Sequence, residues 1–192
     1  MKNILFLATL IYSTLILGQN EEFNLIQLDS TWGQEVLRFP ARDMSYNGVG
    51  EIRFPPKGWI NPEHIFFWSY TYAWSINLNE KITAEELEID LVKYFNSLNK
   101  VDVNDETDMR KASAIITETK TIKTTSFFEG KVATYDRFAT NKRFILNVKI
   151  ESNFCAKSKR TVLLFTFSPK EFTHEVWKTL NNIELEKGFC DK

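Results

Sequence analysis

The sequence predicts an α+β fold: a single domain with an antiparallel sheet of about six to eight strands and two helices packed on one face of it. Three observations lead to this prediction. The aromatic segment 65–78 alternates large and small side chains, two later segments begin with helix-capping residues, and residues 111–168 show strand patterns almost throughout. The short connections expected between these strands favour antiparallel pairing.

The chain opens with the pattern of a secretory signal peptide. Lys2 precedes a mostly apolar run, 4–17, and the small residue Gly18 follows it. This run is too short for a membrane span, which takes roughly 20 apolar residues. We therefore expect a signal peptide over 1–19 and one exported domain over 20–192. The mature chain should have no transmembrane segment, and its destination is the periplasm or the cell exterior.

Charge and cysteine content restrict the function further. Removing Lys2 with the signal leaves 23 bases against 25 acids, a net charge of −2, which argues against a nucleic-acid partner. Cys155 and Cys190 are the two cysteines. In an exported chain such a pair favours a disulfide, and two thiols that never meet are the alternative. A catalytic cysteine would need a histidine, and only His64 and His174 occur.

Before the first helix we expect strands separated by irregular structure. One short strand is predicted near 32–39, and another near 51–54 inside a proline- and glycine-rich region, 40–62. The segment 65–78 then forms a long strand, with its aromatic residues on one buried face and small, mostly polar residues on the other. A helix follows: Thr83 and Glu86 fit a capping box, an apolar stripe continues from Leu87, and the end is near Asn99.

The second half is predicted to be β-rich and to close with a helix. Residues 112–123 are rich in Ile and Thr, 127–132 suggest a hairpin turning at Glu129-Gly130, 144–151 alternate, and 161–167 are apolar on both faces. Ser168, Pro169 and Glu171 then occupy the cap, first and third positions of a final helix, which should extend to Gly188.

Two resemblances rest on these segments. The last strand, its Ser168-Pro169 turn and the final helix look like the close of Mog1/PsbP-type domains, which implies a fold and no more. The F-W-S-Y-x-Y-x-W strand at 67–74, with the T-F-S-P…H-x-x-W ending, is similar to an uncharacterised family of small exported bacterial proteins. That resemblance implies export but no activity and no functional residues.

Signatures of catalysis are mostly missing from the sequence. It has no G-x-S-x-G elbow and no H-E-x-x-H zinc motif, so we expect no metal and no cofactor. Residues 102–108 carry oxygen ligands at alternate positions, but the turn glycine of a calcium loop is missing and Ser113 stands at the glutamate position. We expect a solvated acidic loop there. Carboxylate pairs for glycoside cleavage remain open, since no pair is singled out.

Charge is unevenly distributed along the chain. Residues 110–170 contain 13 bases and 4 acids, whereas residues 79–108 contain 3 bases and 9 acids. One explanation is a solvated sheet face with lysines that guard its edges. The other is an anion-binding surface for acidic glycans, lipid headgroups or an acidic protein.

We therefore expect an exported non-catalytic binding protein whose ligand is anionic or glycan material of the cell envelope. The alternative is an envelope-associated enzyme, such as a hydrolase with an acidic site. Binding residues tend to lie on irregular segments above a rigid sheet, which points to the region 40–62. The candidates there are Arg42, Tyr46, Arg53, Lys57 and Trp59. The competing explanation is that Phe54 and Trp59 plug an open end of the core.

Overall fold

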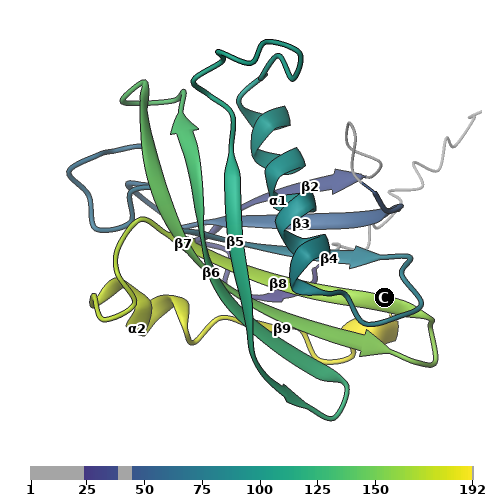
Figure 1. The fold of residues 1–192 in the computed structure, drawn as a ribbon. Coiled ribbons are helices and arrows are strands. Elements are labelled where there is room, and N and C mark those ends of the chain that lie inside the picture. The colour runs from purple at the N-terminus through teal and green to yellow at the C-terminus, as the bar shows by residue number, and fades with distance from the viewer. Residues whose placement is uncertain (1–23, 39–44, 192) are drawn as a thin grey trace, which may run out of the picture.

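The computed structural model describes residues 24–38 and 45–191 (Figure 1). The expected signal peptide and Arg42 lie outside the described residues. The strands are β1 Ile26–Gln27, β2 Gly33–Arg38, β3 Gly48–Phe54, β4 Tyr70–Ile76, β5 Ser113–Ile122, β6 Thr125–Asp136, β7 Lys142–Cys155, β8 Arg160–Ser168 and β9 Glu184–Leu185. The helices are α1 Ala84–Leu98, α2 Val176–Leu180 and the 3₁₀ turn η1 Phe189–Asp191.

Seven strands form one antiparallel sheet in the order β2-β3-β4-β8-β7-β6-β5. The chain builds β2, β3 and β4 as one meander and then crosses through α1 to the opposite edge (Figure 1). From there β5 to β8 return as a second meander, and β8 pairs with β4 at the centre. The domain is therefore mostly β, with a sheet of the expected size. A separate two-stranded sheet joins β1 to β9.

Strand β4 is central, and its aromatic face is buried as predicted, but the small residues of its other face are buried as well. It is shorter than expected, because residues 62–68 form turns instead of strand. Trp68 has a φ of 49°, in the left-handed region, and its amide donates to the Trp59 carbonyl at 2.8 Å. The alternation of aromatic residues therefore begins before the strand does: Phe66 and Trp68 belong to it, but the extended backbone starts only at Tyr70.

Helix α1 covers one face of the sheet, which we call the near face. Its capping box forms as predicted: the Glu86 amide donates to the Thr83 side chain, and the Thr83 amide donates to the Glu86 carboxylate. Its apolar stripe packs on Tyr72 and Trp74 of β4 in one large core. Asn99 caps the end of the helix, also as predicted.

The opposite face, the far face, has its own core, and the expectation that both helices share one face is wrong. Ala73, which points away from Tyr72 and Trp74 in β4, packs in a cluster with Trp177 of α2. Both ends of the described chain contribute to this cluster, through residues such as Leu25 of the N-terminal segment. Small side chains on this side of β4 leave room for that second layer.

The second meander corrects one predicted turn. Strand β6 runs without a break through Glu129-Gly130, and the hairpin turns at Lys123-Thr124 instead. A Cβ atom at Gly130 would lie 2.2 Å from the Ile115 carbonyl oxygen. The glycine therefore permits a close approach of two strands, and Lys123, with a φ of 56°, makes the turn.

The final helix is much shorter than its capping pattern predicts, since α2 covers only Val176–Leu180. Ser168 remains in β8, where its hydroxyl accepts from the Lys170 amide at 3.2 Å. The Lys170 carbonyl in turn accepts from the Trp177 indole at 2.9 Å, and Phe172 packs edge-on against Trp177. These contacts hold residues 169–175 in turns.

The expected disulfide forms between Cys155 and Cys190, whose Cα atoms are 5.4 Å apart. It ties the end of β7 to η1. Disulfides persist in oxidising compartments, so this bond is consistent with export. Within the described ranges no helix has the length and apolar character that crossing a membrane requires.

Candidate functional site

The structure separates the binding residues predicted between 40 and 62. Arg53 does not lie on the loop surface: it is 5% exposed on the far face, with its Nε 2.5 Å from Glu51 Oε1. Glu51 is fully buried and also accepts from the amides of Leu25 and Ile26. This carboxylate therefore anchors the N-terminal segment to the sheet, and Arg53 balances its charge.

Tyr46 lies on the near face, away from Arg53. Its hydroxyl donates to Glu86 Oε1 at 3.3 Å. Burial, together with the nearby Glu86 and Asp90 charges, raises the pKa of Tyr46 to about 12. Tyr46 therefore links the segment before β3 to the start of α1.

Lys57 and Trp59 remain together at one end of the sheet. Lys57 is exposed, whereas Trp59 is half-buried among aromatic rings. Its ring centroid is 4.7 Å from that of Phe54, 5.7 Å from that of Phe138 and 6.0 Å from that of Trp68. This packing favours the plug explanation for Trp59.

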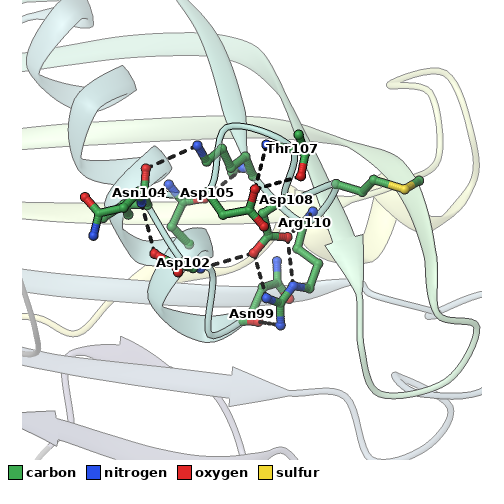
Figure 2. Close-up of polar contacts among 12 residues, drawn as sticks. Asn99, Asp102, Asn104, Asp105, Thr107, Asp108 and Arg110 are labelled. Carbon is green, nitrogen blue, oxygen red and sulfur yellow. Dashed lines mark hydrogen bonds and ion pairs between the residues drawn. The ribbon is translucent and has the colours of Figure 1, made fainter.

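The acidic loop after α1 uses its carboxylates internally (Figure 2). Asp108 accepts from Arg110 at 2.6 Å and from the Asp102 amide at 3.1 Å, and Asp105 accepts from the amide and hydroxyl of Thr107. The hydrogen bonds from Arg110 hold the pKa of Asp108 well below its usual value. No group of three or more His, Cys, Asp or Glu side chains suited to a metal occurs in the part of the chain that the structure describes.

Both histidines have local structural partners. His64 Nδ1 accepts from the Phe66 amide at 3.2 Å, and its ring stacks on Phe66. His174 Nδ1 accepts from the Val176 amide, also at 3.2 Å, next to the start of α2. Each ring thus satisfies a backbone donor in a turn.

The arginines of the basic half bind carbonyl or carboxylate groups of the fold. Arg137 donates to the Leu98 carbonyl at the end of α1 at 3.0 Å, and Arg160 donates to the Ser75 carbonyl at 2.9 Å. Arg143 donates to the carbonyls of Met109 and Lys111. With Arg110 paired to Asp108, the four arginines among the 13 bases of residues 110–170 all bind groups of the fold.

An open groove of about 250 Å³ lies on the far face, between strands β5 to β8 and the segment that begins with α2. We call it the far-face groove. Its principal lining residues are Lys120, Phe127, Glu129, Lys149, Glu151 and Asn181. Leu164 of β8 and Leu180 of α2 add apolar surface.

Lys149 has several polar and aromatic neighbours in this groove. Its Nζ donates to Asn181 Oδ1 at 3.1 Å and lies 3.8 Å from Glu129 Oε1. The same atom is 5.2 Å from the centroid of Phe172 and 5.5 Å from the ring of Trp177. Two aromatic rings, an amide and a carboxylate thus orient one ammonium group.

The neighbouring row of the sheet repeats this mixture of polar and aromatic groups. Lys120, Phe127 and Glu151 lie side by side on β5, β6 and β7, because the strand register pairs them. Lys120 Nζ is 4.6 Å from the Phe127 centroid, and Glu151 Oε1 accepts from Asn153 at 2.9 Å. The groove therefore offers hydrogen-bond donors, acceptors and an aromatic surface within a few residues.

Sequence reasoning missed this groove. Glu129 and Lys149 face each other only because of the register between β6 and β7, and Asn181 joins them from beyond the sheet. No motif marks these positions. The alternation of apolar and polar residues over 144–151 places Lys149 on the less buried face of its strand. It does not indicate that Glu129 and Asn181 lie beside it.

Comparison with protein-family models, curated proteins and solved structures finds no match for this chain. The function is therefore inferred from the geometry of the far-face groove.

Proposed function

We propose that this chain is an exported binding protein without catalysis of its own, and that it holds anionic or glycan material of the cell envelope in the far-face groove. The observation that carries this proposal is the groove that Lys149, Glu129, Asn181 and Phe127 line together, with Lys149 in contact with Glu129 and Asn181. A site whose polar groups are already oriented loses little entropy when it binds a ligand.

Two further observations support the proposal. The charged groups of the groove have partners suited to holding position, since Lys149 lies beside Glu129 and Glu151 accepts from Asn153. The disulfide between Cys155 and Cys190 suits an oxidising compartment. Under this proposal the chain is exported, as are the small bacterial proteins whose aromatic strand its own resembles.

The test uses two adjacent, exposed asparagines. Asn181 lines the groove and Asn182 does not, so Asn181→Trp should fill the groove while Asn182→Trp serves as the matched control. Purified protein is mixed with insoluble bacterial cell-wall and outer-membrane fragments and sedimented. We expect Asn181→Trp to reduce retention about tenfold, the effect of losing roughly 1.4 kcal/mol of binding energy, with an unchanged melting temperature.

Equal retention of the two variants and the wild type would contradict a binding role for the groove. Release of soluble fragments from the envelope material during incubation would instead show that the protein is an enzyme.

A further inference from the structure

The charges in the far-face groove are balanced. Two lysines, Lys120 and Lys149, line it together with two glutamates, Glu129 and Glu151. Lys149 lies 3.8 Å from Glu129, and the strand register sets Lys120 and Glu151 on either side of Phe127. Charges of both signs therefore alternate over the groove, and a polyanion placed there would meet two carboxylates as well as two ammonium groups.

The basic half of the chain, residues 110–170, also has acidic neighbours that the sequence count leaves out. Lys131 lies 3.7 Å from Glu171, and Lys157 lies 3.7 Å from Asp191 at the tail. The arginines of this half bind carbonyls or Asp108, as described above. An extended positive field, which a polyanion site requires, is therefore weakened by pairs of opposite charge.

The remaining chemistry of the groove suits a ligand with many hydroxyl or amide groups and no net charge. Lys149 and Asn181 supply N–H donors, and Glu129 and Glu151 supply carboxylate acceptors. Phe127 adds an aromatic ring beside Lys120, whose Nζ lies 4.6 Å from the ring centroid, and the negative face of such a ring attracts the slightly positive C–H groups of a sugar. Leu164 and Leu180 provide apolar contacts beside these polar groups.

We infer that the far-face groove selects an uncharged glycan rather than a polyanion. This inference rests on the proposed binding function and narrows its ligand class. The Glu129–Lys149 pair acts as the selecting element: the lysine donates to sugar oxygens, and the glutamate accepts from sugar hydroxyls while it repels acidic ligands.

The experiment compares two probes of similar length, a neutral N-acetylglucosamine tetramer and an acidic galacturonate tetramer, by titration calorimetry at low and moderate salt. We expect the wild type to prefer the neutral probe about tenfold, with an affinity that salt barely changes, because the contacts are hydrogen bonds and not net charge. Lys149→Met keeps the aliphatic stem of the side chain. It should weaken binding of the neutral probe about tenfold, the effect of losing one hydrogen bond to a charged group.

Glu129→Gln gives the sharper result, because it removes one negative charge without changing shape. We expect it to create salt-sensitive binding of the acidic probe, at least about tenfold tighter than in the wild type. Glu171→Gln is the matched control: it removes the same charge from the Lys131 pair outside the groove and should leave both probes unaffected. Melting temperatures confirm that each variant is folded.

The outcomes distinguish the inference from the function on which it rests. The wild type could instead prefer the acidic probe and lose that preference in Lys149→Met and at moderate salt. This result would overturn the neutral-glycan inference but leave the binding function in place. Binding of neither probe, or binding that no groove variant alters, would overturn both.

Discussion

At the scale of single residues, two buried aspartates have pKa values that their surroundings shift in opposite directions. Asp136 accepts hydrogen bonds from the amides of Phe138, Ala139 and Thr140 and from the Thr140 hydroxyl. Burial alone would raise the pKa of Asp136, but these hydrogen bonds outweigh it and hold the pKa below its usual value. The Asp136 carboxylate therefore fixes the turn between β6 and β7.

Asp136→Asn should lower the free energy of unfolding at pH 7 by about 1.5–3 kcal/mol, the range for hydrogen bonds to a charged group. A carboxylate with a depressed folded pKa adds stability above its unfolded pKa, about 3.9, and loses it as the pH falls through the folded value. The difference between variant and wild type should therefore shrink toward low pH. Urea unfolding at pH 7 and at several acidic pH values measures it.

Asp90 provides the contrast for this measurement. It is buried in α1, where burial raises its pKa despite a 2.9 Å hydrogen bond from Ser45. A carboxyl group with a raised folded pKa stabilises the fold at low pH and loses that contribution as the pH rises. Asp90→Asn should therefore leave stability at pH 7 unchanged or higher. A loss as large as that of Asp136→Asn would show that the two environments are not distinct.

At the scale of elements, the β5–β6 hairpin offers a direct test of where the chain turns. Lys123→Gly should raise the free energy of unfolding by about 0.5–1 kcal/mol, because glycine relieves a left-handed backbone conformation at a modest entropic cost. Gly130→Ala should lower it by about 1–3 kcal/mol, because the new Cβ meets the Ile115 carbonyl. Equilibrium unfolding in urea measures both. A destabilising Lys123→Gly would mean that Lys123 lies in a strand and not in the turn.

Individual strands and helices could be predicted from the sequence more readily than the far-face groove, and this hairpin shows the reason. The period-two aromatics of β4 and the capping box of α1 are local signals, and both were confirmed. Glu129-Gly130 looks identical in sequence whether its glycine makes a turn or admits a neighbouring strand. Pairing between distant strands decides that, and the same pairing builds the groove around Lys149. Local sequence patterns therefore predict neither the position of this turn nor the groove.

At the scale of the whole molecule, the two faces of the sheet are covered in different ways. The near face is covered by α1, which follows β4 and precedes β5 in the chain. The far core depends on both ends of the described chain: β1 pairs with β9, and the Glu186 amide donates to the Leu25 carbonyl at 2.8 Å. The buried Glu51 fixes the first of these ends, and the disulfide between Cys155 and Cys190 fixes the second.

Removing the disulfide should therefore weaken the far layer first. The sequence separation of its cysteines is 35, and closing such a loop stabilises by about 4 kcal/mol in the chain-entropy model. That is a large share of the roughly 5–15 kcal/mol of a typical domain. The double variant Cys155→Ser, Cys190→Ser should unfold at a lower urea concentration, as should the wild type in reductant. Its hydrogen exchange should accelerate most in β1, β9 and η1, and least in β4 and β8. If the midpoints coincide, or if exchange rises equally in β4 and β9, then the two layers unfold as one unit and the disulfide does not hold the far layer in place.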